Sequence, residues 1–192
     1  DYSIANGFWL EIKKQYTSKS RHYHNLGHIY SMLFQLEQFK SEIVDLDTLQ
    51  FAIWYHDIVY KSSKKDNEEK SADFAKKRLN FVDFSQKRVE NVQKLIISTK
   101  KHQIILRENN DNAILLDLDL SILGQEWKIY QEYVQNIRKE YKMFPNFIYN
   151  PGRKKVLQHF LDRETLYFTD VFKSKYENQA KENLKKEIEL LS

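Results

Sequence analysis

His56 and Asp57 stand side by side inside an otherwise apolar run that extends from Phe51 to Tyr60. Read as a helix that begins after Asp47, the segment places four apolar residues on one face: Leu49, Ala52, Ile53 and Val59. The His-Asp pair lies one turn further along the same face, so we expect it to point inward. A buried imidazole beside a buried carboxylate is costly unless hydrogen bonds, an ion pair or a metal ion compensates it. Any fold of this chain must therefore enclose the pair and supply its partners.

Helix-forming residues dominate the chain. Glycine and proline contribute only four and two of the 192 residues, whereas Leu, Lys, Glu and Ile are abundant, which is typical of a mostly helical protein. The length suits one domain with its own core. We therefore expect an all-α fold, a single compact multi-helix bundle over residues 1–192, with a core over 20–125 and C-terminal helices over 126–192 packed on it.

The residue types that are missing exclude several kinds of chemistry. The chain has no cysteine, which excludes thiol catalysis, thiolate-bound zinc, iron–sulfur clusters and disulfides, and which fits a cytoplasmic protein. The mean hydropathy of -0.70 and the lack of a long apolar run argue against a membrane span, and the N-terminus lacks a signal-peptide core. Any metal must therefore be held by His, Asp or Glu.

The charge is modestly basic. The net charge is +4, from 31 Lys and Arg against 27 Asp and Glu, with lysines spread along the chain. A dispersed basic surface suits anionic ligands, but ordinary solvated helix faces look the same, so the charge does not favour a nucleic-acid partner. The oligomeric state leaves no mark in the sequence.

Apolar periodicity predicts the order of helices. We expect helices over 4–16, 85–98, 113–124 and 125–143, the third of them as a helix rather than a strand because it has no candidate strand to pair with. Asp66 or Asn67 is a good N-cap for another helix. Pro145 and Pro151-Gly152 are expected to bracket a loop, with two or three helices over 153–191. A helix after the polar loop 18–25 carries an apolar stripe of Ile29, Met32, Leu33, Leu36 and Phe39.

Histidines and acids fall on the buried faces of these helices. His28 lies on the stripe of the second helix, with His24 one turn earlier, and acids interrupt a later apolar run at Asp117 and Asp119. If these groups converge with His56 and Asp57, they form a mixed nitrogen and oxygen ligand set that suits Mn, Fe, Co, Ni, Zn or Mg. The sequence does not choose among these metals, or between one ion and two.

A pattern of motifs covers nearly the whole chain. It begins with Arg21-His22-Tyr23-His24-Asn25-Leu26-Gly27-His28 and Tyr55-His56-Asp57-Ile58-Val59-Tyr60 and continues in Asp66 to Ala72, Leu116 to Gly124 and Glu177 to Leu184. It resembles an uncharacterised bacterial branch of the HD-domain superfamily of metal-dependent phosphohydrolases. The resemblance implies an HD-type helical domain that holds a divalent metal through His28, His56, Asp57 and Asp119. Two residues two apart on a helix point about 200 degrees apart, so only one of the downstream acids can face the metal, and Asp117 is the alternative.

Further roles follow from the same resemblance. Asp57 would ligate and orient the attacking water, and Glu68 or His24 would act as the acid or base. His24 is also a candidate for substrate or for a second metal, and His102 for an extra ligand or a hydrogen-bonded helix-end histidine. Arg21 and Lys61, together with Lys64, are candidates for phosphate binding, because Arg offers a bidentate fork and Lys a point charge. Each of these residues has a plain alternative as solvated surface or helix cap.

The resulting hypothesis is hydrolysis of a small phosphorylated metabolite, with a nucleotide as the expected substrate, by a metal-activated water. The alternative is a non-catalytic HD module that binds a metal and a nucleotide in a sensing or regulatory role. A third reading is a helical interaction protein in which His56 and Asp57 are a satisfied buried pair.

Overall fold

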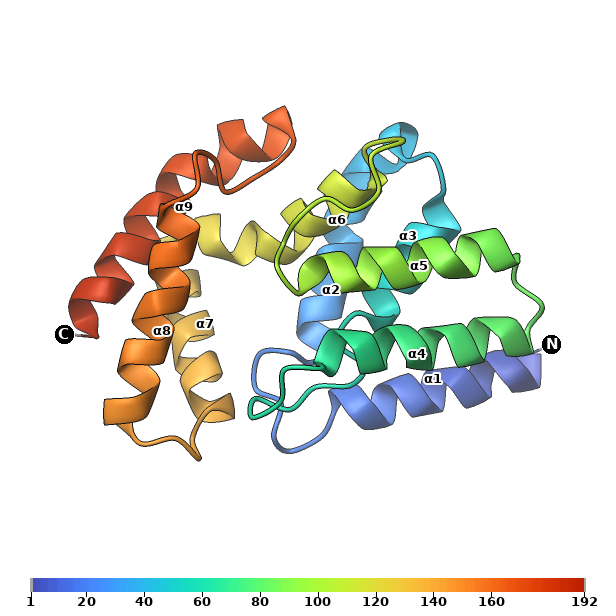
Figure 1. The fold of residues 1–192 in the computed structure, drawn as a ribbon, viewed down its shortest axis with the longest axis horizontal. Coiled ribbons are helices and arrows are strands. Elements are labelled where there is room, and N and C mark those ends of the chain that lie inside the picture. The colour runs from blue at the N-terminus through green and yellow to red at the C-terminus, as the bar shows by residue number, and fades with distance from the viewer. Residues whose placement is uncertain (1, 192) are drawn as a thin grey trace. The chain divides into compact units, whose positions relative to one another are not determined.

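The computed structural model describes residues 2–191, which contain nine α-helices, two short 3-10 helices and no strand (Figure 1). The all-α prediction is confirmed. The chain separates into two compact units, the first ending at Leu118 and the second beginning at Asp119. The HD-type arrangement and the single domain over 1–192 stay predictions. Within 2–191, no helix has both the length and the apolar character needed to cross a bilayer.

The first unit is built from helices that bury one face each. They are α1 (Tyr2–Tyr16), α2 (Leu26–Leu36), η1 (Glu37–Glu42), α3 (Leu46–Tyr55), α4 (Asn67–Phe81), α5 (Gln86–Thr99) and most of α6 (Asp111–Leu120). In Figure 1, α4 and α5 run side by side, and α5 also packs on α3. The core is lined by aliphatic side chains at helical spacing, among them Ile29, Met32, Leu36, Leu49, Ile53, Leu79, Val92 and Ile96.

The start of α3 is fixed by a network of charges. Asp45 caps the helix by accepting a hydrogen bond from the Thr48 backbone N–H at 3.1 Å. Arg88 of α5 donates hydrogen bonds to the same carboxylate through Nε at 2.8 Å and through Nη2. Asp111 of α6 accepts hydrogen bonds from the backbone N–H groups of Val44 and Asp45, both at 2.9 Å. Three helices are therefore tied together at the entry to α3.

Asp45→Asn keeps a good N-cap residue but removes the negative charge that pairs with Arg88, so it is expected to lower the free energy of unfolding by about 1 kcal/mol. The Arg88 hydrogen bond holds the pKa of Asp45 below its usual 3.8. A carboxyl group whose pKa is lower in the folded than in the unfolded protein stabilises the fold at pH values above its unfolded-state pKa. This stabilisation is lost as the pH falls through its folded-state pKa. Urea midpoints measured from neutral to acidic pH should therefore fall more steeply in wild type than in Asp45→Asn. Asp47→Asn, a change at the more exposed partner of Arg88, is the matched control and should retain the wild-type slope.

The connection from α5 to α6 has no helix but is pinned at its middle. The side-chain oxygen of Asn112 accepts hydrogen bonds from the backbone N–H groups of Ile105 and Leu106 at 2.8 and 3.0 Å. The amide nitrogen of Asn112 donates to Ser98 Oγ of α5 at 2.8 Å. Asn112 is fully buried, so this connection is attached to the core between its two ends.

The second unit contains the end of α6, η2 (Ser121–Gly124), α7 (Trp127–Glu140), α8 (Asn146–Leu161) and α9 (Asp170–Leu190). It is organised around a buried ion pair. Arg153 of α8 donates to Glu187 of α9 through Nε at 2.7 Å and Nη2 at 3.0 Å. Tyr130 of α7 donates its hydroxyl hydrogen to the same carboxylate, and Arg153 also donates to the Tyr133 hydroxyl at 3.3 Å. Because Glu187 is only 1% exposed, these bonds hold α7, α8 and α9 together from inside.

The predicted loop between Pro145 and Pro151-Gly152 is wrong, because α8 runs through Pro151. A proline inside a helix removes one backbone donor and crowds the preceding turn. Here the tertiary contacts of the helix outweigh that penalty, since Tyr149 and Leu157 are buried and Arg153 is held by Glu187. The other predicted helices are present with ends shifted by a few residues, and two helices cover the C-terminal region.

Candidate metal centre

Two helix ends bring the first three predicted ligands together. His28 lies in the first turn of α2, where Asn25 caps the helix by accepting a hydrogen bond from the Gly27 N–H at 2.8 Å. Asn25 also donates to the His22 carbonyl at 2.8 Å, which fixes the loop that precedes the helix. His56 is the C-cap of α3, and Asp57 follows it. The two segments are 28 residues apart in the chain and meet at their side chains.

The three ligand atoms form a compact group. The Nε2 atoms of His28 and His56 are 3.3 Å apart, and His56 Nε2 lies 3.1 Å from Asp57 Oδ2. Among the described residues, His28, His56 and Asp57 are the group whose potential ligand atoms all lie within 4.8 Å of one another. The His28 and His56 residues are 7% and 2% exposed, and the Asp57 side chain is 15% exposed. The prediction that the His-Asp pair points inward is therefore confirmed for His56, while Asp57 keeps partial access to solvent.

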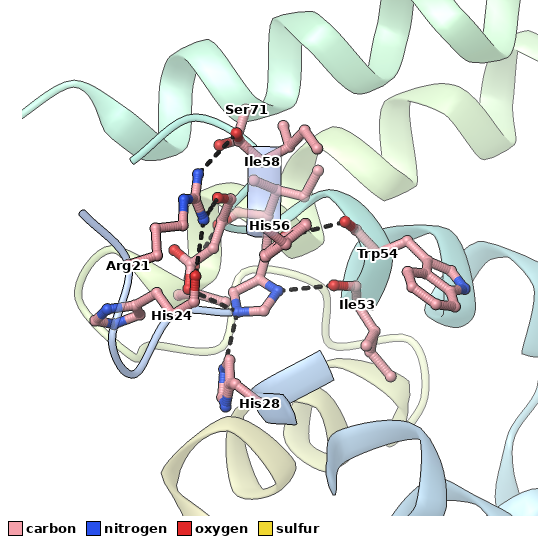
Figure 2. Close-up of polar contacts among 12 residues, drawn as sticks. Arg21, His24, His28, Ile53, Trp54, His56, Ile58 and Ser71 are labelled. Atoms are coloured by element: carbon pink, nitrogen blue, oxygen red, sulfur yellow. Dashed lines mark hydrogen bonds and ion pairs between the residues drawn. The ribbon is translucent and has the colours of Figure 1, made fainter. Parts of the chain in front are cut away.

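The backbone decides which nitrogen of His56 carries a proton. His56 Nδ1 lies 2.9 Å from the Ile53 carbonyl oxygen (Figure 2), and a carbonyl oxygen can only accept, so Nδ1 must donate. In neutral His56 the Nε2 lone pair then faces the Asp57 carboxylate and His28 Nε2. The His56 Nε2 lone pair and the Asp57 carboxylate, 3.1 Å apart, repel each other. His28 Nε2, 3.3 Å away, donates to His56 Nε2 when it carries the His28 proton and presents a third lone pair when the proton is on Nδ1. A metal ion bound among the three atoms would remove the repulsion. A metal-binding histidine commonly donates its other N–H to a carbonyl in this way, so the group fits a divalent ion.

The predicted helix through Val59 is wrong at its C-terminal end, because α3 stops at Tyr55. Ser71 of α4 accepts a hydrogen bond from the Val59 N–H at 3.1 Å and donates to the Val59 carbonyl at 3.3 Å. Asn67 binds the backbone N–H and carbonyl of Lys61 at 3.1 and 3.0 Å. These polar side chains satisfy backbone groups that a longer helix would have paired, so the segment after His56 is a turn held against α4.

Arg21 attaches the histidine loop to this turn. Its Nη1 donates to the carbonyls of His24 and Asp57 at 3.0 and 2.6 Å, and its Nη2 donates to the Ile58 carbonyl at 2.9 Å. Figure 2 shows its guanidinium group directed at this part of the backbone. The guanidinium lies 4.8 Å from the centre of the Tyr16 ring. The predicted role of Arg21 in phosphate binding stays a prediction.

His24 lies in an aromatic cluster beside the three ligands. Its ring stacks on Tyr60 with centroids 4.2 Å apart, and it lies 6.2 Å from the ring of His28. The Tyr23 ring contacts both histidines, at 5.0 Å from His24 and 4.9 Å from His28. His24 is therefore next to the site, and its role as acid, base, substrate contact or second-metal ligand stays a prediction.

Glu68 lies in the first turn of α4, one residue after Asn67. It is half-buried, and its pKa is raised, first because burial disfavours the charged carboxylate and further because the negative charge of Asp57 is nearby. The cation of Lys100 partly opposes this shift. A carboxyl group with a raised pKa keeps its proton to a higher pH, which is what a general acid requires.

The other predicted site residues lie outside the compact group of three ligands. The Lys61 side chain is exposed, and only its backbone takes part in the turn. Asp117 is fully buried in the first unit but is not part of the compact group, and His102 is also outside it. Asp119 is the first residue of the second unit, and its place as the fourth ligand stays a prediction. Of the two downstream acids, neither is therefore established as a ligand.

Sequence reasoning missed the residues that support the ligands. Ser71 and Asn67 lie within the conspicuous segment Asp66 to Ala72, but Asn67 was considered there only as a helix cap and Ser71 was given no role. Asn67 and Ser71 lie four residues apart and therefore on one face of the helix. Two polar side chains on a buried face need hydrogen-bond partners, and nearby backbone groups can supply them. The Ile53 carbonyl contact has no residue-type signal, because any residue supplies a carbonyl.

No protein-family model matches the chain, and comparisons with the curated proteins and with the solved structures find no match.

Proposed function

We propose that this chain is a metal-dependent phosphohydrolase of the HD-domain type, which cleaves a small phosphorylated metabolite such as a nucleotide. The observation that carries the proposal is the orientation of His56, whose Nδ1 donates to the Ile53 carbonyl and whose Nε2 faces His28 Nε2 and Asp57 Oδ2. This arrangement supports a cation site formed by His28, His56 and Asp57, with Asp119 as the proposed fourth ligand.

A divalent ion bound there supplies Lewis-acid chemistry, since it lowers the pKa of a water and polarises a phosphoryl oxygen. The side chains have complementary tasks. Asp57 contributes the negative charge of the group and is the ligand with partial solvent access, so it orients the attacking water. Glu68 holds the proton that the leaving oxygen receives, and exposed Lys61 contributes positive charge for the phosphate.

The first experiment measures metal binding and phosphate release on one preparation. The protein is stripped with a chelator, titrated with Mn, Fe, Co, Ni, Zn and Mg, and then assayed for phosphate release from nucleotides and small phosphoesters. Binding of at least one metal with metal-dependent release supports the proposal. Binding of metal and nucleotide without release would favour the non-catalytic sensing module. Failure to bind any metal would favour the satisfied buried pair and end the proposal.

Glu68→Gln is expected to lower the rate of phosphate release by about 100-fold or more, the usual contribution of a general acid or base. In wild type the rate should fall as pH rises through the raised pKa of Glu68, because the acid form is lost. The Gln variant should lack this alkaline limb. Glu69→Gln is the matched control, since Glu69 is the next residue of α4 and pairs on the surface with Lys100. An unchanged alkaline limb in Glu68→Gln would remove Glu68 from the mechanism.

A further inference from the structure

Arg21 is a buried cation whose hydrogen bonds go to neutral acceptors. It is 8% exposed, and its bonds within residues 2–191 reach the backbone carbonyls of His24, Asp57 and Ile58. Aromatic rings flank the group, with Tyr16 and Tyr60 at 4.8 and 5.6 Å from its central carbon. A guanidinium tolerates such a site better than an ammonium, because it is less strongly hydrated and spreads its donors in a planar fork.

These bonds connect the two segments that carry the ligand group. The His24 carbonyl belongs to the loop that leads into α2 and therefore to His28, whereas the Asp57 and Ile58 carbonyls belong to the turn that carries the His56-Asp57 pair. The same Tyr60 ring that faces Arg21 also stacks on His24. Tyr16 adds a third anchor, since its hydroxyl donates to the Trp54 carbonyl near the end of α3 at 3.0 Å.

We propose that Arg21 is a positioning residue that holds the His24–His28 segment, at the start of α2, against the His56-Asp57 turn and thereby sets the spacing of the metal-ligand atoms. This inference rests on the proposed metal site, and it gives Arg21 a task different from direct phosphate binding. A donor fork committed to the carbonyls of His24, Asp57 and Ile58 acts before any substrate arrives. The consequence is that Arg21 governs metal affinity in the absence of phosphate compounds.

The test compares Arg21→Lys and Arg21→Gln with wild type. Lysine keeps the charge but loses the fork, and Gln loses both. Metal affinity is measured by calorimetric titration without any phosphate compound, and both variants are expected to bind about 10- to 100-fold more weakly, the usual effect of losing a group that orients metal ligands. Arg78→Lys is the matched control, because Arg78 also stacks on a ring, Phe74, and binds a side chain of α1, Glu11, in the same unit.

A second readout requires no metal. Hydrogen exchange followed by mass spectrometry should show faster exchange in peptides covering 22–28 and 57–60 in both Arg21 variants, with α5 unchanged. Weaker metal binding together with this local loosening supports the proposal. Wild-type metal affinity in the variants, with only KM for substrate raised, would overturn it in favour of phosphate binding. If wild type binds no metal, the proposed function fails, and the exchange data alone then decide whether Arg21 clamps the two segments.

Discussion

Asp57→Asn and His56→Ala are each expected to abolish metal-dependent phosphate release, and both variant proteins are expected to bind the metal weakly or not at all. The reason is that His56→Ala removes one ligand atom from a group whose members lie within 4.8 Å of one another, and Asp57→Asn replaces the anionic carboxylate of that group by a neutral, weaker amide ligand. Lewis-acid stabilisation contributes several kcal/mol, so its loss lowers the rate by about 100-fold or more. Metal content is measured by elemental analysis of dialysed protein, and turnover by phosphate release.

The matched control for this prediction is Asp73→Asn, which removes an exposed carboxylate from α4 in the same unit. It should retain wild-type metal content and turnover. Circular dichroism of all variants checks that the helices are intact, since His56 is a buried residue. Undiminished metal content in both Asp57→Asn and His56→Ala would show that the ion binds elsewhere, and undiminished turnover would remove the pair from the reaction.

Glu187→Ala is expected to destabilise the second unit by about 3 to 5 kcal/mol, the usual cost of removing one partner from a buried ion pair. The change leaves the Arg153 guanidinium, whose side chain is 10% exposed, without its carboxylate. It also leaves the Tyr130 hydroxyl without its acceptor. Chemical unfolding is followed through the fluorescence of Trp127 in α7, which reports on this unit, in a background where Trp9 and Trp54 are replaced by Phe.

Two comparisons separate charge burial from simple loss of packing. Glu189→Ala changes an exposed acid on the same helix and should shift the midpoint little. The double variant Arg153→Met, Glu187→Leu removes both charges and is expected to be more stable than Glu187→Ala, because no buried charge is left uncompensated. A Glu187→Ala midpoint equal to that of wild type contradicts the structural role of the pair.

Periodicity predicted most of the helices because each buries one face at regular spacing. The segment 113–124 illustrates this: its alternation of acids and leucines also fits a strand, but residues 2–191 contain no strand to pair with it, and it folds as α6 and η2. The C-terminal end of α3 was not predicted correctly, because it depends on contacts with distant residues rather than on local periodicity. Its termination at Tyr55 depends on Arg21 and Ser71, which reach the turn from distant parts of the chain.

The candidate site residues that stand out from their sequence neighbours could be predicted from the sequence. His56 and Asp57 reveal themselves as polar residues in an apolar run, and His28 lies on a buried helical stripe. The tautomer of His56 was not predictable, because it follows from the Ile53 carbonyl three residues earlier and from where α3 ends. Arg21 stood out because it precedes the histidines, yet its contacts with carbonyls near Asp57 became visible only in three dimensions.

The buried Asn112 amide divides the connection between Thr99 and Asp111 into two shorter arcs. The entropy of closing a loop grows only slowly with its length, so one long free loop would be inexpensive in chain entropy but would sample many conformations. Pinning Ile105 and Leu106 to a core residue restricts that freedom on both sides. Residues inserted before Ile105 would therefore lengthen one arc without disturbing the other, and the stretch behaves as two independent surface loops.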